Sequence, residues 1–137
     1  MEPHFSLSDL EFETQLQNAT LDPKLFSHEA HLRLAYIHLK TYGLELAIET
    51  ICQHIKNYVG LLGAMERFNM TLTVAAVRAV HHFMSKSTAT HFKDFILAFP
   101  RLKSHFKELM GFHYSFDIYE NPKAKASYLA PDLLPFD

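Results

Sequence analysis

Apolar residues recur at the three- to four-residue spacing of an amphipathic helix along almost the whole chain, and no other feature of the sequence constrains the fold so strongly. The few strand-like pieces are too short to build a sheet. We therefore predict an all-α fold: one domain spanning 1–137, built as a bundle of about five to six helices. An N-terminal helical segment (1–22) precedes a helical core (28–110) and an irregular C-terminal arm (111–137).

Capping residues mark where the predicted helices begin and end. Ser8 followed by Glu11 predicts a capping box, Ser27 predicts the start of a second helix, and Gly43 predicts its end. The short connection at Gly43 makes the second and third helices an antiparallel hairpin. The predicted helices span 9–18, 28–42, 44–59, 68–84, 90–99 and 101–110. The Pro-punctuated arm that follows either lies over the bundle or binds a partner.

Composition excludes several classes of protein. The net charge of −2 argues against a nucleic-acid partner and against binding to an anionic membrane, because both require a basic excess. Cys52 is the only cysteine, which excludes an internal disulfide and a Cys-rich zinc module and fits a reducing compartment. The N-terminus lacks the pattern of a signal peptide, and the stretch between Arg67 and Arg78 is too short to span a bilayer. These features predict a cytoplasmic protein.

The ten histidines are the unusual part of the composition. On the predicted helix 28–42, His28, His31 and His38 share one face. The charged residues of this helix gather on another face: Glu29, Arg33 and Lys40. We expect the charged face to meet solvent and the histidine stripe to point toward the interior. Other histidines show no usable pattern, and we predict that they lie on the surface: His4, His91, His105 and His113.

Two polar residues, Asn69 and Thr73, begin the otherwise apolar inner face of the predicted helix 68–84. Buried polar groups cost free energy unless they are hydrogen-bonded, so these residues and the inward histidines need partners. Four alternatives are open: these residues hydrogen-bond to one another, bind ordered water, bind a metal, or line a cavity for a ligand. The resulting candidate pocket for a small ligand consists of His28, His31, His38, Asn69 and Thr73.

The spacing of His28 and His31 would also let both imidazoles reach one divalent metal ion, the candidate cofactor. Two nitrogens make half a site, and the missing ligands would come from His38, His54, a carboxylate or water. The same two histidines are the candidate catalytic acid or base, because imidazole titrates near neutral pH. The ordinary alternative is a structural role in hydrogen bonding, so the sequence leaves open whether the chain is an enzyme.

Three segments together resemble an uncharacterised family of small bacterial all-helical proteins with the pattern HxxHL…YHETxT…AR…PDL. The matching segments read HEAHL at 28–32, FNMTLT at 68–73 and AK…PDL within 124–133. The resemblance implies that His28, His31 and the start of the fourth helix converge on one site. The chain has Asn69-Met70 where the family has His-Glu, and Asn69 is a poor transition-metal ligand that cannot act as a base.

Three functional hypotheses follow from these patterns. In the first, a small helical-bundle protein holds a small ligand or a metal ion in the histidine-containing pocket. In the second, the chain is a protein-protein interaction module whose core histidines are structural and whose partner is unknown. In the third, buried neutral histidines make stability depend on pH.

Overall fold

The computed structural model describes residues 1–136 and confirms the all-α fold. Eight α-helices and three short 3-10 helices make up the regular structure of these residues, and no strand occurs among them. Contacts divide the chain into two compact units, which we call the first unit (Met1–Phe68) and the second unit (Asn69–Asp137). The prediction of a single domain stays a prediction, and each unit is described by itself.

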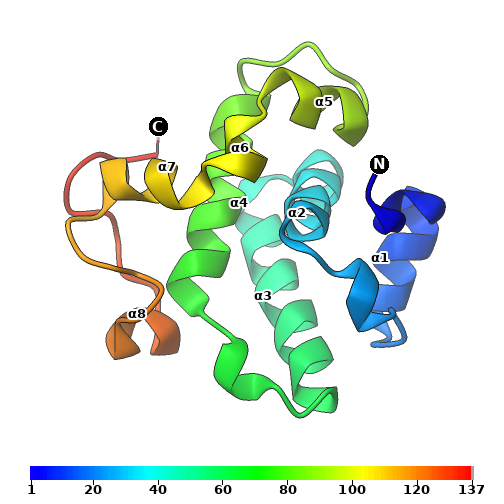
Figure 1. The fold of residues 1–137 in the computed structure, drawn as a ribbon, viewed down its shortest axis with the longest axis horizontal. Helices are drawn as coiled ribbons and strands as arrows, with labels where there is room; N and C mark the ends of the chain where they lie inside the picture. Colours follow the sequence, from blue (N-terminus) through cyan, green and yellow to red (C-terminus); the bar gives the residue numbers. More distant parts are fainter. Residues whose placement is uncertain (137) are drawn as a thin grey trace. The chain divides into compact units, whose positions relative to one another are not determined.

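Three long helices build the first unit (Figure 1). α2 packs along α3, and α1 packs against both. The bounds of the helices are α1 Asp9–Gln17, α2 His28–Tyr42 and α3 Leu44–Leu61, and the 3-10 helices are η1 Pro3–Ser6, η2 Pro23–Leu25 and η3 Met65–Arg67.

The predicted helix ends of the first unit are confirmed. Ser8 and Glu11 form a reciprocal capping box at the start of α1, with the Glu11 amide donating to Ser8 Oγ at 3.1 Å. Ser27 Oγ accepts from the Ala30 amide at 3.2 Å at the start of α2. Gly43 alone separates α2 from α3, and its φ of 79° requires a residue that tolerates the left-handed region.

The predicted exposure of the charged side of α2 is confirmed for Lys40 and wrong for Glu29 and Arg33. Glu29 and Arg33 are 5% and 4% exposed, whereas His28 from the expected inner stripe is exposed. The N-terminal segment 4–9 covers this face of α2, because Arg33 donates to the carbonyl oxygens of His4 and Leu7. Glu29 and Arg33 therefore lie at an internal contact between two parts of the first unit.

The second unit consists of one long helix, α4, and four short ones. α4 begins two residues later than predicted, after Asn69. The predicted helix 101–110 is interrupted at His105, which ends α6 and precedes α7. The helices span α4 Met70–Met84, α5 Phe92–Ala98, α6 Arg101–Ser104, α7 Phe106–His113 and α8 Pro122–Ala126.

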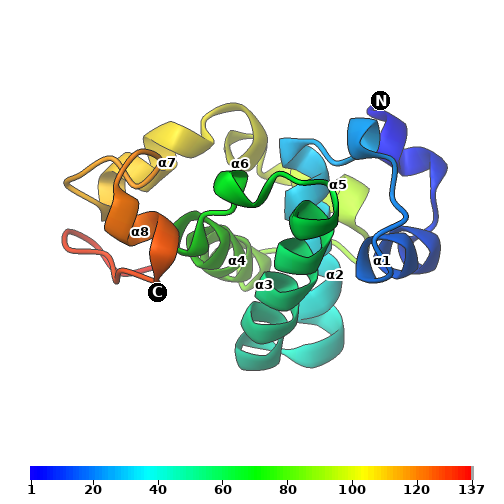
Figure 2. The same cartoon turned by 90° about the horizontal axis from the view of Figure 1, so that it is seen from below.

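The C-terminal arm is an integral part of the second unit, with α8 beside α4 (Figure 2). The fully buried Thr71 hydroxyl donates to the Ser127 carbonyl and accepts from the Leu129 amide, both at 2.9 Å. The Tyr114 hydroxyl donates to the Leu129 carbonyl at 2.8 Å. Of the two predicted alternatives, the structure shows the arm that lies over helices, from 113 through the buried Phe136.

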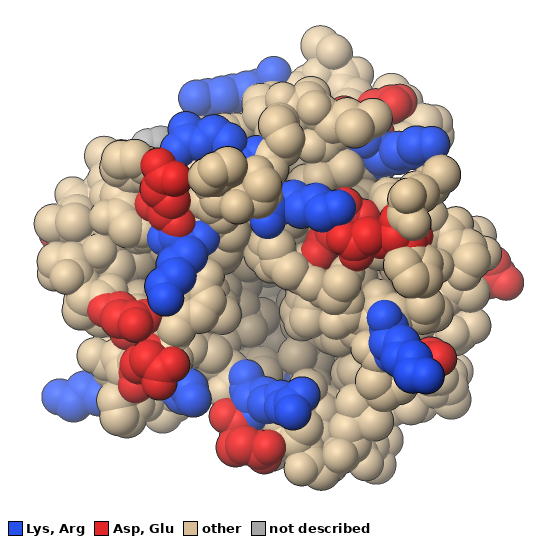
Figure 3. Space-filling model, in the orientation of Figure 1, with Lys and Arg blue, Asp and Glu red and all other residues tan. Residues whose placement is uncertain are grey.

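Charges of both signs are interspersed on the face drawn in Figure 3, in agreement with the balanced composition. Within residues 1–136, none of the helices combines the length and the apolar character that crossing a membrane requires.

Candidate metal-binding site

The predicted metal pair lies at the start of α2. His28 is exposed, and His31 is half-buried with its ring stacked on Phe26 at a centroid distance of 3.8 Å. His31 Nδ1 donates to the Ser27 carbonyl at 2.8 Å. Burial lowers the pKa of His31 to about 4, against the opposing effect of this bond, so the ring is neutral at pH 7. Among the described residues, no third His, Cys, Asp or Glu completes a metal-ligating group with this pair. The metal role stays a prediction.

Asn69 and Thr73 have structural tasks in the second unit. Asn69 Oδ1 accepts from the Leu72 amide at 3.0 Å and caps α4, while Nδ2 donates to the Ile118 carbonyl at 2.8 Å. The Thr73 hydroxyl donates to the Asn69 carbonyl at 2.7 Å. The predicted pocket would join these residues to histidines of the first unit, so the pocket also stays a prediction.

A buried cluster that the sequence reasoning missed lies between the N-terminal segment and α2. It brings ligand atoms of Glu2, His4 and Glu29 within 4.8 Å of one another. The predicted surface position of His4 is wrong, because its side chain is completely buried. No sequence signal could have found this cluster, since His4 precedes the first periodic segment and Glu29 lies 25 positions away.

Arg33 determines how the proton on His4 is placed. The Arg33 Nη1 atom lies 3.3 Å from His4 Nδ1, and a guanidinium can only donate, so Nδ1 accepts. The remaining proton is therefore on Nε2, which donates to Glu29 Oε1 at 2.6 Å. A metal on Nε2 would force a proton onto Nδ1, directly facing the Arg33 donor. This arrangement favours a structural network over metal ligation.

The five N–H groups of Arg33 all have an acceptor. Besides His4 Nδ1, they reach the carbonyl oxygens of His4 at 2.8 Å and Leu7 at 2.9 Å, and they reach Asp9 Oδ1 twice, at 2.8 and 3.2 Å. The guanidinium also lies 4.9 Å from the centre of the Phe12 ring. The network is complete and fastens the N-terminal segment to α2.

A second polar cluster joins the three long helices of the first unit and has the opposite character. It consists of Glu13 from α1, His38 from α2 and His54 from α3, and we call it the three-helix cluster. His38 is completely buried. Its Nε2 atom lies 3.7 Å from Glu13 Oε1, beyond hydrogen-bond distance, and in the described part of the chain it has no hydrogen-bond partner. The same holds for the buried Nδ1 of His54.

Thr50 determines which nitrogen of His38 carries the proton. The Thr50 hydroxyl donates to the Leu46 carbonyl at 2.9 Å, so its oxygen accepts from His38 Nδ1 at 2.8 Å. Nε2 is therefore the unprotonated nitrogen, and its lone pair faces a carboxylate. Burial, and secondly the neighbouring His54, lower the pKa of His38 to about 4. At neutral pH two acceptors thus face each other without a hydrogen between them.

The rings of His54 and Tyr42 both pack against His38 in the three-helix cluster. The ring centres of His38 and His54 are 5.6 Å apart, with an angle of 77° between the ring planes. Tyr42 packs edge-on against His38 at 5.4 Å, and its hydroxyl donates to Glu13 Oε1 at 3.4 Å. The sequence reasoning had included His38 in the pocket and His54 among the possible ligands, whereas it did not identify Glu13.

Comparison of the chain with models of known protein families, with curated protein sequences and with solved structures finds no match. The resemblance to the small bacterial family stays a prediction.

Proposed function

We propose that this protein binds a divalent transition-metal ion such as Zn²⁺ at the three-helix cluster, through Glu13, His38 and His54. The observation that carries the proposal is the buried Nε2 of His38, which has no hydrogen-bond partner and lies 3.7 Å from Oε1 of Glu13. A cation between the two atoms would turn the repulsion of two acceptors into two favourable bonds.

The chemistry of the donors suits such an ion. Two imidazoles and one carboxylate form a donor set that Zn²⁺ uses in proteins, often with water in the fourth position. Metal-bound histidines ordinarily donate their other ring N–H to an oxygen, which orients the ring. His38 already has this arrangement through Thr50. Because the pKa of His38 is lowered to about 4, protons do not compete for its Nε2 at neutral pH.

The distances fit two of the three donors. Ligand atoms about 2.1 Å from a tetrahedral ion lie about 3.4 Å from each other. His38 Nε2 and Glu13 Oε1 are 3.7 Å apart, so a shift of a few tenths of an ångström brings them to ligating distance. The three donor atoms are not all within 4.8 Å of one another, so His54 must turn its ring to present Nδ1. His54 is half-buried, whereas its Nδ1 atom is buried and has no hydrogen-bond partner.

The test is a titration of tag-free protein with Co²⁺ and Zn²⁺, since Co²⁺ bound by nitrogen and oxygen in a tetrahedral site acquires strong visible absorption. We expect one equivalent to bind to the natural chain and Zn²⁺ to displace Co²⁺. Glu13→Gln and His38→Leu should lower the affinity at least about tenfold, because each removes one ligand. Glu49→Gln, an exposed carboxylate on α3, is the matched control and should bind normally.

Two further variants separate this site from its competitors. The double substitution His28→Ala/His31→Ala should leave the affinity unchanged, and so should Glu2→Gln. Loss of binding in the first variant would move the metal to the predicted pair at the start of α2, and loss in the second would move it to the His4 cluster. Either result, or absence of binding to the natural chain, would overturn the proposal.

A further inference from the structure

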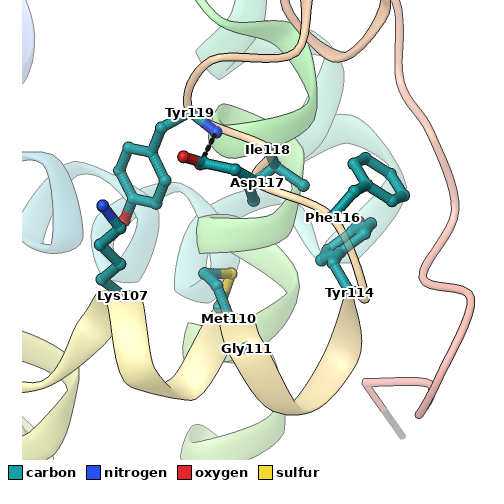
Figure 4. Close-up of a pocket in the computed structure, with 8 residues that line it drawn as sticks. All are labelled: Lys107, Met110, Gly111, Tyr114, Phe116, Asp117, Ile118 and Tyr119. Carbon is teal, nitrogen blue, oxygen red and sulfur yellow. Dashed lines mark hydrogen bonds between the residues drawn. The ribbon is translucent and has the colours of Figure 1, made fainter.

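The second unit contains a cavity of about 220 Å³ beside α7 (Figure 4). Met110 and Ile118 provide apolar surface, and aromatic rings stand on both sides, with Tyr119 opposite Phe116. Pockets for drug-sized ligands have volumes of roughly 300–1,000 Å³. The cavity is smaller and therefore suits a compact molecule with one or two rings.

Two opposite charges line this cavity. The exposed Lys107 places its ammonium 5.2 Å from the centre of the Tyr119 ring, and the exposed Asp117 accepts from the Tyr119 amide at 2.8 Å through Oδ1. In the part of the chain that the structure describes, no ion pair within 4.0 Å joins Lys107 to Asp117. The cavity thus presents one cation and one anion that do not neutralise each other directly.

The presence of glycine at position 111 also indicates a ligand site. Gly111 lies within α7 and lines the cavity, although a glycine in a helix costs roughly 0.5–1 kcal/mol relative to alanine. A Cβ built on Gly111 meets no atom within 4 Å, and its φ is not in the left-handed region. Neither close packing nor backbone conformation requires glycine here, and the missing side chain keeps the cavity wide.

We propose that this cavity binds a small zwitterionic aromatic molecule, of the class of the free aromatic amino acids. The ring of the ligand would lie between Tyr119 and Phe116 over the apolar floor. Its carboxylate would meet Lys107, and its ammonium would meet the carboxylate of Asp117. A ligand with only one charge would leave the opposite charge of the cavity without a partner.

L-Tryptophan is the probe, because the chain contains no tryptophan and indole emission then reports the ligand alone. Its fluorescence anisotropy is followed on titration with the full chain, with excitation beyond the tyrosine absorption band. We expect a saturable rise in anisotropy that L-phenylalanine competes away. Absence of a rise at millimolar protein would overturn the proposal.

Gly111→Leu tests the location of the site. The added side chain narrows the cavity and should weaken binding at least about tenfold, while leucine favours the helix. Gly60→Leu is the matched control, since Gly60 is also an exposed helical glycine with an open Cβ position, in α3 of the first unit. Circular dichroism checks that both variants fold. Equal binding by Gly111→Leu and Gly60→Leu would overturn the assignment to this cavity.

Charge variants with two analogues test the zwitterion. Lys107→Gln should weaken L-tryptophan and indole-3-propionate about fivefold and leave tryptamine unchanged, because tryptamine has no carboxylate. Asp117→Asn should weaken L-tryptophan and tryptamine similarly and leave indole-3-propionate unchanged. Lys93→Gln, an exposed lysine on α5, is the control and should change nothing. If either variant weakened all three ligands equally, or none of them, recognition of the zwitterion would be wrong.

Discussion

The two polar clusters of the first unit contain the same kinds of groups and differ in how completely they are paired. Each has a histidine with no exposed surface and a carboxylate nearby. Around His4, Arg33 and Glu29 assign a partner to each ring nitrogen. Around His38, Thr50 assigns a partner to Nδ1, and Nε2 faces Glu13 without a hydrogen bond. The comparison shows that two equally buried histidines differ in whether the second ring nitrogen has a hydrogen-bond partner.

This difference has opposite energetic consequences in the two clusters. A complete buried network is expensive to break, because removing one member leaves the others desolvated and unpaired. An incomplete network already contains a desolvated, unpaired atom. A bound cation or a new hydrogen-bond donor would remove this free-energy cost. We derive four predictions from this contrast and begin with the change that should destabilise the protein most.

Arg33→Met should be the most damaging change. It removes the donors for Asp9, for His4 Nδ1 and for the carbonyl oxygens of His4 and Leu7, and it should lower the free energy of unfolding by about 3–5 kcal/mol. Urea denaturation measures the loss. The matched control is Arg101→Met, which breaks an exposed 3.6 Å ion pair with Glu108 and should cost less than about 1 kcal/mol. Similar losses for both variants would mean that the His4 network is not a special contributor to stability.

Replacing His4 and His38 one at a time should change the free energy of unfolding by different amounts. His4→Leu leaves Arg33 and Glu29 without their imidazole and should cost about 3 kcal/mol. His38→Leu gives up one bond to Thr50 but also removes a buried nitrogen without a partner, so stability should change by less than about 1 kcal/mol. Denaturation in the presence of a chelator measures both. A larger loss for His38→Leu would contradict the distinction drawn here.

The stability of the metal-free protein should fall in acid partly through His38. The pKa of its imidazole is 6.5 in the unfolded chain and about 4 in the folded one, so the unfolded chain binds more protons between these values. The contribution is complete above pH 6.5 and is lost as the pH falls toward 4. Its size is at most about 3 kcal/mol, because each unit of difference between the two pKa values contributes about 1.4 kcal/mol.

The comparison variant for this pH dependence is His38→Leu, since His31 and the other groups titrate in both proteins. Denaturation midpoints between pH 7.5 and 4.5 should fall less steeply in the variant than in the natural chain. Parallel curves would show that His38 does not titrate in this range.

Glu13→Gln should have the smallest effect and the opposite sign. The amide of glutamine can donate a hydrogen to His38 Nε2, which gives the unpartnered nitrogen the bond it lacks. We expect the metal-free variant to be about 1 kcal/mol more stable than the natural chain, with metal binding lost. Thermal melts with and without Zn²⁺ measure both. A less stable variant would show that the carboxylate already has a favourable role in the metal-free protein.

Local signals in the sequence sufficed for much of the fold. Capping at Ser8 and Ser27 and the break at Gly43 placed three helix ends correctly, because these motifs act within a few residues. The prediction that Glu29 and Arg33 of α2 face solvent was wrong for a related reason. Periodicity finds the face that carries Glu29 and Arg33, but it cannot show that a segment about 25 residues earlier will cover this face and satisfy its charges.

The candidate site was predicted in fragments. The helical wheel placed His38 inward, and His54 was named as a possible ligand. The hairpin at Gly43 brings these two together. Glu13 looked like an ordinary charged residue of the first predicted helix. Its position beside His38 depends on how α1 packs against α2 and α3, and this is tertiary information that no local pattern contains.

The single-residue connection at Gly43 has a consequence for the order of folding. His38 and Thr50 are twelve residues apart, and His54 follows one turn later, so their contacts form as soon as the α2–α3 hairpin closes. Contacts of such short sequence separation close on a microsecond timescale, long before distant segments meet. The α2–α3 hairpin would thus bring both imidazoles together before α1, which carries Glu13, packs against it.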